Sequence, residues 1–222
     1  QGQDETVKAP GALVISAYVT CPDVSKTVTP DLKLREEGRL LYVDLGCGNH
    51  RVGGSSLAQV YNQVGQETPD VNDSELLKRA FPVVQTLISQ GLISAGHDRS
   101  DGGLITTLLE MAFSGNCGLQ VNLQDHDLTD PIRLLFAEEL GLVFEVHEDV
   151  EPGVLKAFSL AQVPCVAIGK ATVDFAANIK VNGVSVLEGD TREFRDLWEE
   201  TSFHLEALQA NPRCVEQERE GL

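Results

Sequence analysis

The 222-residue sequence is poor in positive charge and in long apolar runs. Lysine and arginine number 17 against 34 aspartate and glutamate residues, so the formal net charge at pH 7 is −17. This excess of negative charge repels phosphate backbones and anionic lipid, which argues against nucleic acid and membranes as partners. No stretch approaches the roughly 20 apolar residues that a membrane-spanning helix requires. The first residues resemble no signal peptide, and we therefore expect a cytoplasmic protein.

The sequence also lacks paired cysteines. Its five cysteines are an odd number and none is in a C-x-x-C pair, so we expect neither a zinc site nor a disulfide framework. Cys47 follows a predicted strand and has His50 three residues further on, which is an order that a nucleophile and its base can take. A nucleophile elbow begins its helix at once, whereas here six residues follow Cys47 before Gly54, so we favour a structural interpretation.

What the sequence does contain is an alternation of strand and helix signals. The hydrophobic content of 42% is enough for a sizeable core. Strands are predicted at Arg39–Gly46, Gly91–Gly96, Leu142–Val146, Val163–Ile168, Asn178–Val181 and Val184–Leu187, and helices at Ser55–Gln63, from Asn72 to Ile88, from Leu104 to Gly115, from Asp130 to Gly141 and at Thr191–Leu208. Asn182-Gly183 is a strong hairpin signal between the last two strands. We predict an α+β fold in which helices cover a mixed β-sheet.

Composition divides the chain into four predicted parts. Residues 1–23 end in the β-rich run Ala12–Cys21, which has the pattern of a strand without its sheet. Residues 24–37 have the aperiodic, polar composition of a linker. Residues 38–190 hold the predicted domain. Residues 191–222 are predicted to form an amphipathic helix and a tail, and we expect the apolar stripe of that helix to pack against another surface.

The densest group of candidate functional residues is Gly96–Leu104 (GHDRSDGGL), between a predicted strand and a predicted helix. A helix N-terminus attracts anions, glycines let a phosphate approach the backbone, and the carboxylate of Asp98 or Asp101 offers the hard oxygen that Mg²⁺ prefers. The structural alternative is that Ser100 or Asp101 only caps the helix. His97 is a candidate base, although a histidine at a strand end more often makes local hydrogen bonds.

Two other groups carry weaker signals. The glycine-rich turn Leu45–Ser56 also precedes a predicted helix, but it matches neither G-x-G-x-x-G nor G-x-x-x-x-G-K-[ST]. The paired carboxylates Glu138 and Glu139 fall at the predicted end of a helix and are candidate metal ligands. Negative charge is unfavourable at that end of a helix, and solvated carboxylates are the more ordinary interpretation.

Several stretches together carry a family resemblance: GRLLYVDLG, GGSSLAQVY, GHDRSDGGLITTLLEMAFSGNCGLQV and LFAEELGLVFEV. They resemble the C-terminal half of the second aminoimidazole-ribonucleotide-synthetase-like module of the phosphoribosylformylglycinamidine synthase family. The resemblance begins at TVKAPGALVISAYVTCPDV, which is similar to the last strand of the preceding half-module. It ends at LWEETSFHLEALQANPRCVEQE, which is similar to the connector toward a glutaminase domain. Its most specific element is HDRSDGGL with the helix sequence that follows.

The resemblance implies an ATP-dependent ligase of purine synthesis that converts formylglycinamide ribonucleotide and glutamine to formylglycinamidine ribonucleotide and glutamate, releasing ADP and phosphate. It implies that Asp98 is a ligand of Mg²⁺ and that Ser100, Gly102 and Gly103 contact a small-molecule nucleotide, ATP or ADP. In that family this half of the assembly holds an auxiliary nucleotide. The other metal ligands and the glutaminase domain lie outside the matched region, so the resemblance implies a fragment that is inactive by itself and whose partners are the remaining domains.

Two other interpretations stay open from the sequence. The first is the equivalent ATP-binding domain of a superfamily relative, of the selenophosphate synthetase or thiamine-phosphate kinase type; the connector and the FAEELG context argue against it. The second is a non-enzymatic acidic interaction module whose glycine turns are structural and whose amphipathic tail is a docking element. A glutaminase domain encoded downstream would decide for the ligase.

Overall fold

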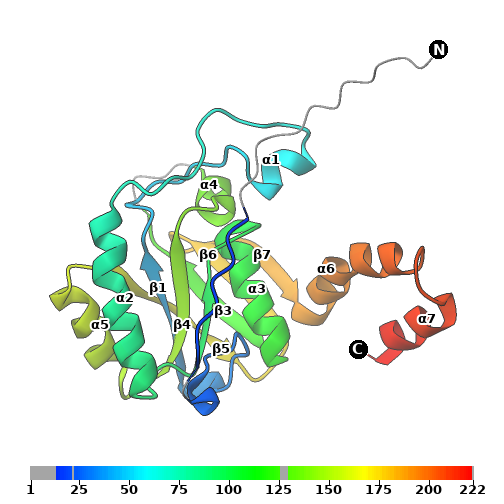
Figure 1. Ribbon diagram of the computed structural model, residues 1–222. Helices are drawn as coiled ribbons and strands as arrows, with labels where there is room; N and C mark the ends of the chain where they lie inside the picture. The colour runs from blue at the N-terminus through cyan, green and yellow to red at the C-terminus, as the bar shows by residue number, and fades with distance from the viewer. Residues whose placement is uncertain (1–13, 22, 126–129, 222) are drawn as a thin grey trace.

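Helices pack on a mixed β-sheet in the residues that the computed structural model describes, which are 14–21, 23–125 and 130–221 (Figure 1). The strands are β1 (Gly38–Asp44), β2 (Ala95–Asp98), β3 (Gly118–Leu123), β4 (Gly141–His147), β5 (Cys165–Thr172), β6 (Ala176–Val181) and β7 (Val184–Asp190). The helices are α1 (Ser56–Val60), α2 (Ser74–Ser89), α3 (Gly103–Gly115), α4 (Pro131–Phe136), α5 (Glu151–Leu160), α6 (Thr191–Glu206) and α7 (Pro212–Gly221). The predicted α+β class is confirmed.

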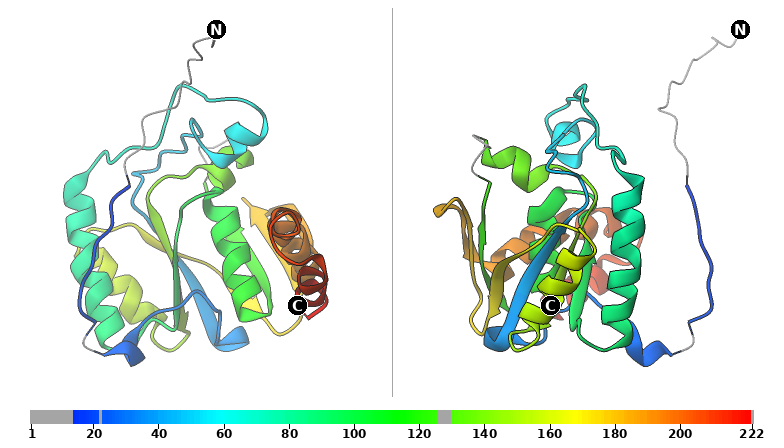
Figure 2. Two further views of the ribbon diagram at one scale, coloured as in Figure 1. Left: turned by 45° about the vertical axis from the view of Figure 1, so that its right-hand side comes forward. Right: turned by 90° about the vertical axis from the view of Figure 1, so that its left-hand side faces the viewer.

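The sheet order is β2-β4-β1-β5-β3-β6-β7, and only the β3–β6 pair is parallel within the described residues. Successive side chains of a strand point to opposite faces. Leu41 and Val43 of β1 therefore join a core with α2 and α5, whereas Leu40 and Tyr42 join a second core with α3 and α4. Helices thus lie on both faces of the sheet (Figure 2).

One edge of the sheet collects three loops that are distant in the sequence. Strands β1 and β2 both pair antiparallel with β4, so they run in the same direction and end at the same edge. Asp44, the last residue of β1, lies opposite Gly141, and Asp98, the last residue of β2, lies opposite Leu142. The loops after β1 and β2 and the loop before β4 therefore meet at this edge, which includes both glycine-rich turns.

Several element boundaries differ from the predictions. The strand expected over Gly91–Gly96 is β2 instead, because pairing with β4 starts only at Ala95 and continues to Asp98. The helix expected to reach Gly141 ends at Phe136, since the backbone of Ala137 is extended. The predictions from sequence did not include β3, α5 or α7. The first turn of α5 contains a proline and a glycine, which are typical of turns and loops.

The segment with linker composition is bound to the domain. The side chain of Leu32 is buried, and the carbonyl of Thr29 accepts a hydrogen bond from the backbone N–H of Gly96. The carboxylate of Glu145, itself buried in β4, accepts hydrogen bonds from the backbone N–H groups of Lys33 and Leu34 at 2.9 and 3.1 Å. A polar, aperiodic sequence can thus be ordered by backbone hydrogen bonds, which composition does not reveal.

The two ends of the described chain lie outside the sheet. Residues 14–21 form no strand, and their large apolar side chains are mostly exposed. Helices α6 and α7 extend beyond the sheet (Figure 1), and Leu197 and Leu205 of α6 are exposed within the described residues. None of the described helices has the length and apolar character that crossing a bilayer requires. The four-part division of the chain remains a prediction.

Candidate functional site

The turn from β2 to α3 presents two candidate side chains to solvent and buries the residue between them. The side chain of Asp98 is 68% exposed, and Ser100 is exposed as well. The guanidinium of Arg99 is completely buried. Because Arg99 turns inward, Asp98 and Ser100 are both accessible on the outer side of the turn.

Arg99 fixes the turn from inside. Its Nε donates to the carbonyl oxygen of Glu139 at 2.5 Å and its Nη2 to that of Leu140 at 3.0 Å, while Nη1 donates to the hydroxyl of Tyr42. Nη2 also lies 3.6 Å from Oδ1 of Asp44. Burial raises the pKa of Tyr42 above its usual value, so this hydroxyl stays protonated. The sequence analysis assigned no role to Arg99, although it lies between the candidate residues Asp98 and Ser100.

The second glycine-rich turn is closed by internal hydrogen bonds. The carboxylate of Asp44 accepts hydrogen bonds from the N–H groups of Gly46 at 2.9 Å and Gly48 at 2.7 Å. The N–H groups of Gly53 and Gly54 donate to backbone carbonyl oxygens at 2.8 and 2.6 Å. These donors are engaged within the protein, so the turn is not an open cradle for phosphate.

Cys47 and His50 do not form a nucleophile and its base in the described residues. The Nε2 atom of His50 lies 2.8 Å from Oδ2 of Asp125, and its Nδ1 atom is buried without a hydrogen-bond partner. Cys47 is exposed. The structural interpretation of this pair is therefore supported.

The carboxylates of Glu138 and Glu139 are not solvated charges at a helix end, and that interpretation was wrong. Glu139 is fully buried and bonds Arg51 at both of its oxygens, with Nε···Oε1 at 2.6 Å and Nη2···Oε2 at 2.8 Å. Burial opposes ionisation, but the hydrogen bonds from Arg51 outweigh it and hold the pKa of Glu139 below its usual value. Oε1 of Glu138 accepts the N–H groups of Ser56 and Gly102, both at 2.8 Å. Both carboxylates therefore join separate loops.

The side chains of Ser100 and Asp101 do not cap α3, so the structural alternative given for these two residues was wrong. The N-cap residue is Gly102 with φ of 82°, and its own N–H is bonded by Glu138. Gly103 has φ of 74°, and a Cβ atom there would lie 2.7 Å from the carbonyl oxygen of Leu135. Both glycines thus have a conformational reason that is independent of any ligand.

His97 makes local hydrogen bonds. Its Nδ1 lies 2.7 Å from the carbonyl oxygen of Asp98 and its Nε2 lies 3.1 Å from Oε2 of Glu110. The bond with Glu110, together with the contacts to Asp98, raises the pKa of His97 above its usual value. This arrangement favours the local interpretation over a role as a base.

Asp98 fits Mg²⁺ as one ligand among several. Its carboxylate is exposed, and its Oδ1 lies 3.3 Å from Nδ1 of His97. Among the residues with described positions, no group of three or more histidine, cysteine, aspartate or glutamate side chains is arranged to hold a metal ion. Mg²⁺ prefers an octahedral shell of oxygen atoms, so the described residues do not form a complete carboxylate site by themselves.

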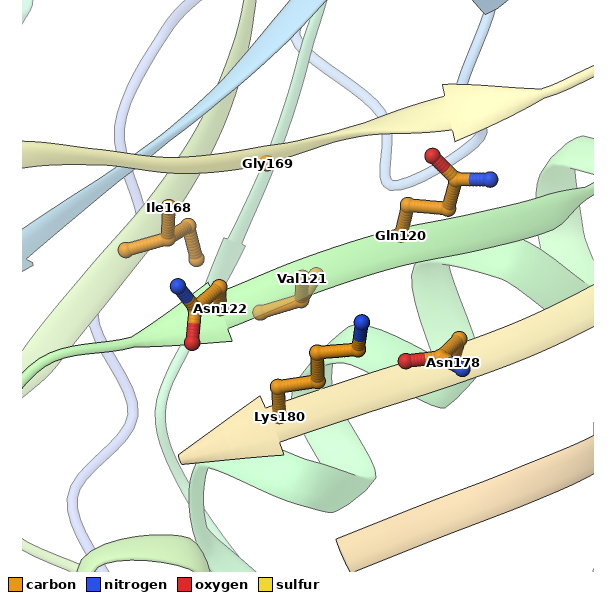
Figure 3. Close-up of a pocket in the computed structure, with 7 residues that line it drawn as sticks. All are labelled: Gln120, Val121, Asn122, Ile168, Gly169, Asn178 and Lys180. Carbon is orange, nitrogen blue, oxygen red and sulfur yellow. The ribbon is translucent and has the colours of Figure 1, made fainter. Parts of the chain in front are cut away.

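Two surface pockets are alternatives to the turn between β2 and α3. One of about 400 Å³ lies on the sheet, where polar side chains of β3 and β6 surround it, including Gln120, Asn122 and Lys180 (Figure 3). Another of about 410 Å³ lies between α3 and α6 and includes His97. Neither is lined by Asp98 or Ser100, so the candidate site is an open turn at the sheet edge.

The fold and this turn place the chain in a known class. The family model of the AIR synthase related protein, C-terminal domain, matches residues 37–182, and the chain belongs to that family. The match covers the sheet up to β6 together with the turn between β2 and α3.

The relatives that match nearly the whole of this chain are much longer than it is. The chain is 52% identical over 222 residues to phosphoribosylformylglycinamidine synthase of Homo sapiens, covering 98% of this chain and 16% of that protein. It is 51% identical over 219 residues to the probable phosphoribosylformylglycinamidine synthase, chloroplastic/mitochondrial, of Arabidopsis thaliana, with the same two shares. A structure of Thermotoga maritima PurL complexed with ATP has the same fold, with a TM-score of 0.60 at 14% identity over 76% of this chain and 27% of that one. The chain thus spans about a sixth of the curated relatives.

Proposed function

We propose that this chain is the C-terminal half of a synthetase-like module within a phosphoribosylformylglycinamidine synthase. That ATP-dependent ligase converts formylglycinamide ribonucleotide, glutamine and ATP to formylglycinamidine ribonucleotide, glutamate, ADP and phosphate. The observation that carries the proposal is the 52% identity with the human enzyme over 98% of this chain. The activity belongs to the longer protein, because the chain corresponds to 16% of that relative.

The part of the reaction that we assign to this chain is nucleotide binding. In the ligase, ATP phosphorylates the amide oxygen of the substrate, and ammonia from a glutaminase domain then displaces the phosphate. Asp98 would hold Mg²⁺ through a carboxylate oxygen, and the ion would neutralise phosphate charge. Ser100, Gly102 and Gly103 would contact the auxiliary nucleotide. The exposure of Asp98 and Ser100 on either side of the buried Arg99 supports this assignment.

The partners that we propose follow from the same assignment. They are the remaining domains of the longer protein, a glutaminase domain among them, and ATP or ADP. The net charge of −17 supports the expectation that nucleic acid and membranes are not partners. We also propose a cytoplasmic location, although the Arabidopsis thaliana relative is named chloroplastic/mitochondrial.

The experiment that tests the assignment is Asp98→Asn in the full-length protein that contains this chain. The amide keeps the shape of the side chain and one oxygen but removes its charge, so Mg²⁺ should be held more weakly. We expect the content of bound nucleotide and Mg²⁺, measured after denaturing the purified protein, to fall by about tenfold or more, which corresponds to about 1.4 kcal/mol.

The matched control is Asp101→Asn, which removes the same charge from an exposed residue of the same turn. We expect this variant to retain bound nucleotide. If Asp98→Asn retains nucleotide and Mg²⁺ as well as Asp101→Asn does, then Asp98 is not a metal ligand and the nucleotide assignment fails at its central residue.

A further inference from the structure

One oxygen atom of Glu138 joins two helix starts that are far apart in the sequence. Oε1 accepts the N–H of Ser56, the first residue of α1, and the N–H of Gly102, the N-cap of α3, each at 2.8 Å. The two donors lie 82 and 36 residues from Glu138. A carboxylate that accepts two backbone N–H groups makes charge-assisted hydrogen bonds, which are stronger than neutral ones.

Other groups hold other parts of the same turn, such as Thr107, whose hydroxyl donates to the carbonyl oxygen of Asp98 at 3.0 Å. Arg99 holds the inner side of the turn through the carbonyl oxygens of Glu139 and Leu140. Glu139 is occupied by Arg51. No side chain of the turn itself caps the first turn of α3, and Glu138 bonds the N–H of its N-cap residue from a distant loop.

We infer that Glu138 is a positioning residue for the nucleotide-binding turn, holding Ser100, Gly102 and Gly103 in place through the N–H of Gly102. This inference rests on the proposed function. It also limits how Gly102 can contact the nucleotide. The N–H of Gly102 already donates to Glu138 and is not available as a donor for phosphate. As a direct ligand of Mg²⁺, the alternative role, Glu138 would lose most from removal of its negative charge, whereas as a positioning residue it would lose most from an oxygen that no longer reaches both donors.

Reach and charge can be separated by three substitutions. Glu138→Gln keeps the chain length and an oxygen acceptor but loses the charge. Glu138→Asp keeps the charge but is shorter by one methylene, so we expect its oxygen not to reach both donors. Glu138→Ala loses both. A positioning role predicts that the glutamine variant is weakened least, because its oxygen still reaches both donors although the hydrogen bonds become neutral.

The measurement is the amount of bound nucleotide and Mg²⁺ per mole of the full-length protein that contains this chain, released by denaturing each purified variant. Glu138→Asp and Glu138→Ala should lower the bound nucleotide by about tenfold, as is typical for residues that orient a ligand, and Glu138→Gln should stay within about twofold. Glu200→Ala, which removes an exposed carboxylate of α6, serves as the control and should match the unchanged chain.

The outcomes separate this inference from the proposed function. If the glutamine variant is weakened while the aspartate variant is not, charge decides and Glu138 is a ligand rather than a positioning residue. If all three variants retain nucleotide like the unchanged protein, Glu138 does not position the turn, although the protein still binds nucleotide. If Asp98→Asn retains nucleotide and Mg²⁺ in the same protein, the proposed nucleotide site itself is wrong and the inference falls with it. Should Glu138→Ala not fold, the comparison of glutamine with aspartate decides alone.

Discussion

Single residues at this sheet edge are constrained by space as well as by backbone conformation. Gly48 and Gly103 have nearly the same φ, 72° and 74°, which strains any residue with a Cβ atom. At Gly48 a Cβ atom would meet nothing within 4 Å, whereas at Gly103 it would lie 2.7 Å from the carbonyl oxygen of Leu135. Substitution at Gly48 would therefore add backbone strain only, whereas substitution at Gly103 would add the same strain and a steric clash between α3 and α4.

We predict that Gly48→Ala destabilises the protein by about 1 kcal/mol, through backbone strain alone. Gly103→Ala should cost about 2 kcal/mol more, because α4 must move to admit the methyl group. Urea denaturation of both variants measures the two free energies of unfolding. Equal losses would show that Gly103 is not required by the contact with α4.

At the scale of an element, α2 and α3 begin in different ways. Asp73 caps α2 by accepting the N–H groups of Glu75 and Leu76 at 2.9 and 3.0 Å. Asp101 makes no such bond at the start of α3, where Gly102 is the N-cap residue. An aspartate close to the start of a helix is thus a cap in one case and an exposed residue in the other.

Accordingly, Asp73→Ala should lower the free energy of unfolding by about 1 kcal/mol, the usual loss for an N-cap. Asp101→Ala should change it by less than about 0.5 kcal/mol, as exposed substitutions generally do. Thermal melts of the two variants give the comparison. A larger loss for Asp101→Ala than for Asp73→Ala would mean that Asp101 caps α3 in solution.

For the molecule as a whole, carboxyl groups couple stability to pH. Hydrogen bonds from Arg192 lower the pKa of Asp190 to about 2, and those from Arg51 lower the pKa of Glu139 despite its burial. A carboxyl group whose pKa is lower in the folded state stabilises the protein above its unfolded pKa. That contribution is lost as the pH falls through the folded value.

We therefore expect the free energy of unfolding to decrease as the pH falls below about 4.3, the ordinary pKa of glutamate. Glu139→Gln should be less stable at pH 7, because Arg51 loses its anionic partner, and its stability should depend less steeply on acid pH. Urea denaturation at a series of pH values tests both statements. An equal slope below pH 4.3 for the variant and the unchanged protein would contradict the assigned effect of Glu139.

Sequence was sufficient wherever the decisive interactions are local. Asn182 and Gly183 adopt φ of 51° and 81°, as their hairpin signal indicated. Asp130-Pro131 starts α4 through an N-cap bond to the N–H of Ile132, and α3 ends at Gly115 as predicted. The strand β3 carried a usable signal that was missed, since apolar and polar residues alternate from Leu119 to Leu123 and the structure buries the apolar ones. Such signals act within a few residues of the chain, and for that reason they survive without tertiary structure.

Tertiary structure alone decided what the charged residues of the site do. Glu138 and Glu139 are adjacent in sequence, yet one bonds Ser56 and Gly102 and the other bonds Arg51. Their partners lie 36 to 88 residues away, and no period or spacing in the sequence relates them. They meet because β1, β2 and β4 share one edge of the sheet, and that pairing results from burying two cores on opposite faces. A buried carboxylate must find hydrogen-bond donors, and only the folded chain determines which donors are within reach.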